Sequence, residues 1–167
     1  KIISQIKKFY PNIDLRLNDV SAKLDPLNLE INTKTIGTDI IYRKKIIRIE
    51  KINSKISIKS FLNDKFSLTE ITISSKPLAI KDLMTFIRFF NNDPKLFIAE
   101  RFIKKGLLVA DLKLEFDDTG NVKKKYEFSG LVKDGRIDLF KRYNLNKIDF
   151  NFKINEKSLK FNDIKII

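Results

Sequence analysis

Apolar and polar residues alternate along most of this chain, and the alternation is cleanest after residue 106. Further runs with the same alternation place apolar residues at Ile13, Leu15 and Leu17, at Leu27, Leu29 and Ile31, at Ile47 and Ile49, and at Ile148, Phe150, Phe152 and Ile154. Successive side chains of a strand point to opposite faces, so each run has one apolar and one polar face. The pattern predicts a mainly β protein whose antiparallel sheet has one solvated face.

Short turn sequences separate the alternating runs. Candidate turns rich in Asp, Asn and Gly occupy residues 117–121, 133–135 and 155–157. Because such connections are short, strands adjacent in sequence are expected to be adjacent in the sheet. The predicted arrangement is a β meander.

Helical spacing replaces the alternation between residues 81 and 105. Apolar residues recur at Leu83, Met84, Ile87 and Phe90, and a second run follows the pair Asp93-Pro94, which suits a helix start. Gly106 after two lysines reads as a helix stop. We therefore predict a helical hairpin over residues 81–105, inserted between β repeats in residues 1–80 and a β meander in residues 106–167. All three parts are expected to belong to one domain of a longer protein.

The predicted hairpin has two interpretations. In the first it is a plug that covers one end of the sheet. In the second it is a gate or a membrane-surface element that uses Phe86, Phe89 and Phe90.

Histidine and cysteine are both absent from the chain. Their absence removes the usual zinc sites, Cys–His and Ser–His–Asp nucleophile systems and disulfides. The acidic residues show no spacing typical of metal ligands. We therefore expect no catalytic residues, no metal, no cofactor and no enzymatic activity.

The net charge of +13 comes mostly from lysine and has three interpretations. The first is a compositional bias on a solvated face, and the others are binding to an anionic lipid surface or to nucleic acid. A nucleic-acid interface is expected to gather arginines and exposed aromatic residues in one patch. The seven arginines are instead spread from Arg16 to Arg142, so no nucleic-acid partner is expected.

Two stretches combine short loops with alternating strands. The stretch ISIKSFLNDKFSLTEITISSKPLAIKDL has the short loop Ser60-Phe61-Leu62, a strand over residues 68–73 and a polar break at Lys76-Pro77. The opening IDLRLNDVSAKLDPLNLEI has a pattern of paired alternating strands. Both stretches resemble the AsmA-like family of bacterial envelope proteins, the group of AsmA, TamB and YhdP, and the resemblance covers most of the chain outside the predicted hairpin.

This resemblance implies a curved antiparallel sheet, a repeating β-groove, that holds phospholipid acyl chains without catalysis. It also implies a periplasmic location, an inner-membrane anchor outside this sequence, and contacts with the membrane surface and with neighbouring β repeats of the parent chain. The candidate groove residues are Leu108, Leu112, Leu114, Phe116, Phe128, Phe150 and Phe152, each of which could equally be ordinary core. The alternative functions are a scaffold module for outer-membrane assembly and, less favoured, a basic nucleic-acid-binding domain.

Overall fold

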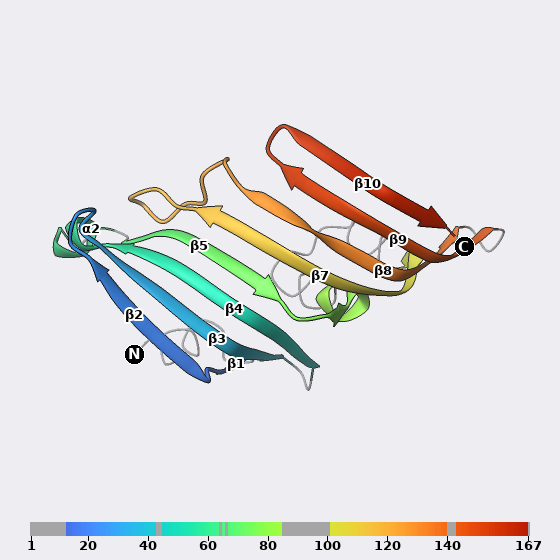
Figure 1. The fold of residues 1–167 in the computed structure, drawn as a ribbon, viewed down its shortest axis with the longest axis horizontal. Coiled ribbons are helices and arrows are strands. Elements are labelled where there is room, and N and C mark those ends of the chain that lie inside the picture. The colour runs from blue at the N-terminus through green and yellow to red at the C-terminus, as the bar shows by residue number, and fades with distance from the viewer. Residues whose placement is uncertain are drawn as a thin grey trace.

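The computed structural model describes residues 13–42, 45–63, 65, 67–84, 101–139 and 143–166. These residues form one curved, unclosed sheet of ten strands in which every pairing is antiparallel (Figure 1). The strands are β1 (Ile13–Arg16), β2 (Asp19–Asp25), β3 (Glu30–Tyr42), β4 (Lys45–Ser57), β5 (Leu68–Ser75), β6 (Leu78–Ala79), β7 (Ile103–Glu115), β8 (Glu127–Leu139), β9 (Tyr143–Asn155) and β10 (Ser158–Ile166). The mainly β, antiparallel fold predicted from the alternation is confirmed.

The strands follow the chain order across the sheet. The path runs β1-β3-β4-β5-β7-β8-β9-β10, while β2 pairs with β3 beside β1, and β6 pairs with β7 beyond the end of β5. β2 lies at the lower left edge of the sheet and β10 at its upper right edge (Figure 1). Among the described residues, each of these two strands is paired on one side only. The sheet is therefore a meander with two open edges.

The strand register aligns apolar residues into a row that crosses the whole sheet. Residues opposite each other in an antiparallel pair share a face, so a chain of such pairs traces one face from edge to edge. Its members, from β2 to β10, are Val20, Thr35, Ile52, Ile73, Leu112, Phe128, Ile154 and Leu159. All but the threonine are apolar. We call this row the central row and its side of the sheet the apolar face.

The opposite side, the polar face, carries cross-strand ion pairs. Glu70 lies between Lys55 and Lys113, with Nζ–carboxylate distances of 3.3 and 2.8 Å. Lys153 and Glu127 form another pair at 2.9 Å. The one wet face expected from the alternation is thus this ion-paired side of the sheet.

The alternation shifts by one residue partway along β3 and β4. Thr35 lies opposite Ile52 and Thr38 lies opposite Ile49, so the residues facing the same side are three apart rather than two. Gly37 lies within this step and has a φ of +68°. The shift keeps Ile49 and Ile52 on the same face, although a regular strand would point an odd-numbered and an even-numbered residue to opposite faces.

A second set of irregularities crosses β8, β9 and β10. Asp134, Lys147 and Asp163 have positive φ values of 50°, 49° and 54°, and the pairing register shifts beside them. On the polar face, the Asp134 N–H donates to the Asp149 carboxylate at 2.8 Å, and Asn151 Nδ2 donates to Asp163 at 2.8 Å. Bulges of this kind bend a strand and increase its twist. Three adjacent strands therefore bend at the same level.

One of the predicted turns is corrected by this finding. Residues 133–135 were expected to join two strands, but they lie inside β8 as a bulge. The strand continues because the neighbouring β9 supplies a side-chain acceptor for the displaced backbone N–H. The predicted turns at 117–121 and 155–157 are confirmed, and in each the first side chain, Asp117 or Asn155, accepts backbone N–H groups.

The predicted helical hairpin is described only at its two ends. Residues 80–84 and 101–102 are helical, while residues 85–100, and with them Phe86, Phe89 and Phe90, lie outside the described residues. The predicted end at residue 105 is wrong, because β7 begins at Ile103, which pairs with Ile137 of β8. Gly106 does not stop a helix. It lies inside β7 with a φ of +150°, where a Cβ atom would come within 2.8 Å of Ile80 Cδ1.

A short helix, α2 (Ile58–Leu62), connects β4 to β5 and contains the Ser60-Phe61-Leu62 loop of the sequence pattern. Ser57 caps the helix, because its hydroxyl accepts the N–H of Ser60 at 3.1 Å. Phe61 and Leu62 are exposed at this end of the sheet.

Candidate functional site

The centre of the apolar face is a packed cluster. Its buried members are Leu78, Leu108, Ala110, Val132 and Phe152. Ile80 and Leu83, from the helical turn after β6, pack against this cluster. This helical turn therefore covers part of the apolar face, while the plug and gate interpretations of the whole hairpin stay predictions.

Small residues beneath the aromatic rings let this cluster pack closely. Gly130 lies between Ala110 and Phe152 in the register, and a Cβ atom there would come within 2.3 Å of the Val109 carbonyl oxygen. The ring of Phe152 packs against Phe128 at a centroid distance of 5.0 Å. A larger residue at position 130 would push neighbouring strands apart.

Beside the cluster, the apolar face is hollowed into a cavity of about 460 Å³. We call it the apolar groove. Its lining comes from strands β3 to β9, from the helical turn after β6 and from the segment before β8. The described lining residues are Ile40, Ile47, Ile49, Ile52, Ile73, Ser75, Leu78, Leu83, Leu108, Ala110, Leu112, Tyr126, Phe128 and Ile154. A volume of this size falls within the range of about 300–1,000 Å³ that is typical of small-molecule sites. Among the described lining residues, only Ser75 and Tyr126 bring polar side-chain atoms to it.

The hydroxyl of Ser75 is already used by the fold. It accepts the backbone N–H of Ala110 at 2.9 Å, at the point where the ladder passes from β5 to β6. Thr38, opposite Ile49, is 1% exposed, and its Oγ1 has no hydrogen-bond partner among the described residues. The groove wall therefore offers shape and apolar surface rather than directed hydrogen bonds.

The apolar face continues beyond the groove to both edge strands. Val20 and Leu24 on β2 are 60% and 59% exposed. On β10 the exposed apolar residues are Leu159, Phe161, Ile164 and Ile166, which are 50–58% exposed. Exposed apolar side chains gathered on one face typically mark an interaction site. The surface left open is thus at the two ends of the face, and the packed cluster lies between them.

The candidate groove residues predicted from the sequence divide into three groups. Leu108, Leu112 and Phe128 line the apolar groove. Leu114, Phe150 and Phe152 lie on the same face outside the cavity, since Leu114 pairs with Ile71 and the two phenylalanines pack with the cluster. Phe116 is not on a strand of the sheet. It follows β7 and forms an isolated bridge with Val122.

Several groove residues on β3 and β4 were not predicted from the sequence. Ile47 and Ile49 follow the alternation, but the predicted groove residues all belong to the cleaner runs after residue 106. Ile52 is off the parity of these two residues and comes to the same wall only through the shift beside Gly37 and Glu50. The usable signal for this half is the density of isoleucine between residues 40 and 52.

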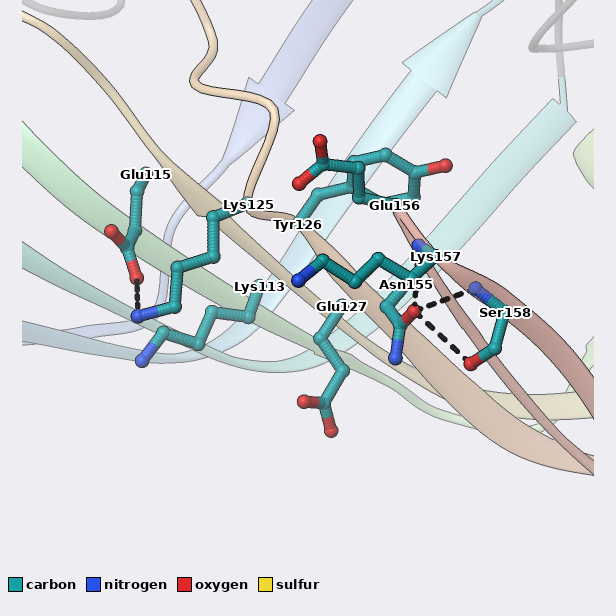
Figure 2. Close-up of a pocket in the computed structure, with 9 residues that line it drawn as sticks. All are labelled: Lys113, Glu115, Lys125, Tyr126, Glu127, Asn155, Glu156, Lys157 and Ser158. Carbon is teal, nitrogen blue, oxygen red and sulfur yellow. Dashed lines mark hydrogen bonds and ion pairs between the residues drawn. The ribbon is translucent and has the colours of Figure 1, made fainter.

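A second cavity, of about 490 Å³, lies at one end of the sheet, and we call it the end pocket (Figure 2). Its lining is polar: Lys113, Glu115, Lys125, Tyr126, Glu127, Asn155, Glu156, Lys157 and Ser158. Tyr126 lines both this pocket and the apolar groove. Lys113, Glu127 and Asn155 are register partners on the polar face, so the end pocket lies on the side of the sheet opposite the apolar groove, and the two cavities meet at Tyr126.

The resolved pKa shifts have structural causes. Burial alone would raise the pKa of Glu70, but its hydrogen-bonded ion pairs with Lys113 and Lys55 outweigh burial and lower it. Turn hydrogen bonds lower the pKa of Asp25, chiefly through the side chain of Asn28, and that of Asp117, chiefly through Thr119. Each shift stabilises the charged form of a carboxylate at a strand pair or a turn.

Two searches of the described residues were negative. Within the described ranges, no group of three or more acidic side chains is placed to hold a metal ion. In the same part of the chain, no helix has the length and apolar character needed to cross a membrane.

Comparisons with known proteins do not assign the chain to a family. No protein-family model, no curated protein and no solved structure matches it.

Proposed function

We propose that this chain is a non-enzymatic lipid-binding module of the bacterial envelope, whose apolar face holds phospholipid acyl chains. The observation that carries the proposal is the central row, apolar in seven of its eight positions and continuous from one open edge of the sheet to the other. Five members of this row line the apolar groove, and the described residues of its wall present almost no free polar atoms. Such a surface suits a ligand that is itself a hydrocarbon chain.

The dimensions and energetics fit an acyl chain. Eight strands at about 4.8 Å spacing give the row a length of about 34 Å. One leaflet of a bilayer's hydrocarbon core is about 15 Å thick, half of the usual 30 Å or so. A chain of that length fits along the row, and each buried methylene contributes about 0.8 kcal/mol without any specific contact.

The open edges support a conduit rather than a closed carrier. β2 and β10 present exposed apolar side chains at the positions where the central row ends. Further β repeats of a parent chain, paired to these edges, would prolong the row. In this proposal the module is periplasmic, an inner-membrane anchor lies elsewhere in the parent protein, and acyl chains move along the row.

A scaffold module for outer-membrane assembly is the second candidate. The same open edges favour it, because an unpaired edge strand is a template for another strand. In that case the apolar face is covered by a protein partner and holds no lipid. The two functions therefore differ in whether lipid accompanies the chain.

The test is lipid retention by the intact chain, produced in the bacterial periplasm and analysed by mass spectrometry of its organic extract. We expect copurifying phospholipid and uptake of an acyl-labelled phospholipid from liposomes. Leu112→Glu should lower uptake at least tenfold, because it places a charge on the groove wall. Val109→Glu is the matched control, since Val109 lies on the same strand, is 40% exposed and is absent from the groove lining.

Circular dichroism of both variants separates lost binding from lost folding. Equal loss of uptake in two folded variants would contradict a role for the groove. Wild-type protein that carries no lipid and takes none up would remove the lipid function and leave the scaffold candidate.

A further inference from the structure

The end pocket lies on the polar face and meets the apolar groove around the end of the sheet, at Tyr126, because the chain bulges before β8. Lys113 of β7 pairs with Glu127, whereas the Lys123 N–H donates to the Glu115 carbonyl at 2.7 Å. One residue of β7 lies between these two contacts, whereas three residues, 124–126, lie between them on the segment before β8. The additional residues displace Tyr126 from the ladder, and its 37% exposed side chain borders both cavities.

The pocket lining carries balanced charge, with three lysines and three glutamates. Four of these side chains are already paired: Lys113 with Glu70 at 2.8 Å, Glu127 with Lys153 at 2.9 Å, and Lys125 with Glu115 at 3.7 Å. The remaining two are Glu156 and Lys157, which form no ion pair within the described part of the chain. One cation and one anion are thus adjacent and unpaired at this pocket.

The turn that carries these two residues is held in place by the fold. Asn155 Oδ1 accepts the backbone N–H groups of Lys157 and Ser158, each at 2.9 Å, and the Ser158 hydroxyl at 3.1 Å. In Figure 2 the Lys157 side chain extends across the pocket toward the side of Lys125. The Lys125 ammonium, in a long pair with Glu115 and with an 83% exposed side chain, can turn toward a ligand.

We infer that the end pocket binds a phosphoethanolamine headgroup of a lipid whose acyl chains lie in the apolar groove, an inference that rests on the proposed function. The phosphate oxygens accept hydrogen bonds from the ammonium groups of Lys157 and Lys125. The primary ammonium of the headgroup donates to the Glu156 carboxylate. Charge-assisted hydrogen bonds of both signs then fix one end of the lipid while the groove holds the other.

This chemistry predicts a preference among headgroups. A choline headgroup has the same charges but no N–H to donate to Glu156. A glycerol headgroup leaves a net negative lipid with no cation for Glu156. The expected order of capture is therefore phosphatidylethanolamine first, then phosphatidylcholine, then phosphatidylglycerol, at equal acyl chains.

The experiment offers the intact chain mixed liposomes of these three phospholipids and diacylglycerol, all with the same chains, and quantifies captured lipid by mass spectrometry. Lys157→Glu should lower phosphatidylethanolamine capture about tenfold, the effect of roughly one charge-assisted hydrogen bond, and leave diacylglycerol capture unchanged. Lys160→Glu is the matched control, because it changes the net charge equally at an exposed β10 position that does not line the pocket. Glu156→Gln should reduce the preference for phosphatidylethanolamine over phosphatidylcholine.

The outcomes separate the headgroup site from the groove. Lipid capture without headgroup preference, or equal effects of Lys157→Glu and Lys160→Glu, overturns the end-pocket assignment and leaves the groove function intact. A wild-type chain that captures neither phospholipid nor diacylglycerol overturns the proposed function itself. Glycerophosphoethanolamine, which has the headgroup and no chains, should not displace the lipid at equal concentration. Displacement would assign the pocket to a soluble phosphate ester instead.

Discussion

Two phenylalanines that face each other across β9 and β10 should differ in their contribution to stability. Phe152 and Phe161 are register partners on the apolar face. Phe152 is 7% exposed and belongs to the packed cluster, whereas Phe161 on the edge strand is 50% exposed. Phe152 packs against Phe128 at 5.0 Å, and Phe161 packs edge-on against Phe150 at 5.5 Å. The pair therefore compares the packed cluster with the open edge of the apolar face at equal side-chain chemistry.

The expected magnitudes follow from this burial. Phe152→Ala removes a buried ring and leaves a cavity, which costs about 3–5 kcal/mol of unfolding free energy. Phe161→Ala should cost about 1–1.5 kcal/mol, since half of that side chain is already in water and the transfer free energy scales with buried area. The difference of about 2–3.5 kcal/mol corresponds to roughly 1–2 M in the urea midpoint at an m-value near 2 kcal/mol/M.

The assay is urea unfolding followed by far-ultraviolet circular dichroism, because the chain has no tryptophan to report by fluorescence. Phe152→Leu and Phe161→Leu form a milder pair for which the same order is expected. Equal midpoints for the two alanine variants would refute the reasoning, because they would mean that Phe161 is covered in solution. A folded Phe161→Ala variant that also takes up less acyl-labelled lipid would place the edge of the face in contact with the ligand.

Two other predictions concern polar groups within the sheet. Thr38→Val should raise the unfolding free energy by about 1 kcal/mol, because it removes a buried hydroxyl that has no partner while keeping the side-chain volume. A lower urea midpoint for this variant would contradict the unpartnered state. Glu70→Gln should cost about 0.5–1 kcal/mol at pH 7, because it breaks the ion pairs with Lys55 and Lys113. The pKa of Glu70 is lower in the folded than in the unfolded chain, so the ion pairs contribute fully above the unfolded pKa of about 4.3. The contribution is lost as the pH falls through the folded pKa. The urea midpoints of wild type and variant should therefore converge below about pH 4. A constant gap between pH 7 and pH 3 would contradict the ion-pair explanation.

The alternation predicted the second half of the sheet well because strand pairing and side-chain periodicity agree there. The prediction of Leu112 and Phe128 rests only on their positions in the alternation, and the structure places them opposite each other on the groove wall. Parity says which residues share a face. It does not say which of them are covered, so Phe152 in the cluster and Leu112 on the wall had the same pattern in the sequence.

Strand irregularities explain most of what the sequence did not predict. A Lys-Asp-Gly sequence is common in turns, and only the acceptor side chain of Asp149, 15 residues away, makes it a bulge within β8. Gly106 has the local context of a helix stop, yet pairing with β8 extends β7 past it. Both cases depend on a neighbouring strand, and such contacts are absent from local sequence patterns.

The irregularities are also what convert an amphipathic sheet into a groove. A regular alternation over eight strands would give a twisted sheet with one apolar side, and that side would need a second layer to cover it. Here the step at Gly37 in one half and the bulges at Asp134, Lys147 and Asp163 in the other bend the strands, while hydrogen bonds and ion pairs hold the polar face together. The cavity lies on the apolar face, so the bending encloses part of that surface with the sheet's own strands. Because the path stays open at β2 and β10, the enclosed surface remains continuous with the exposed apolar residues at both edges. The function proposed here needs a surface that is partly enclosed and still open at both edges. It therefore depends on the bends and not on the alternation alone.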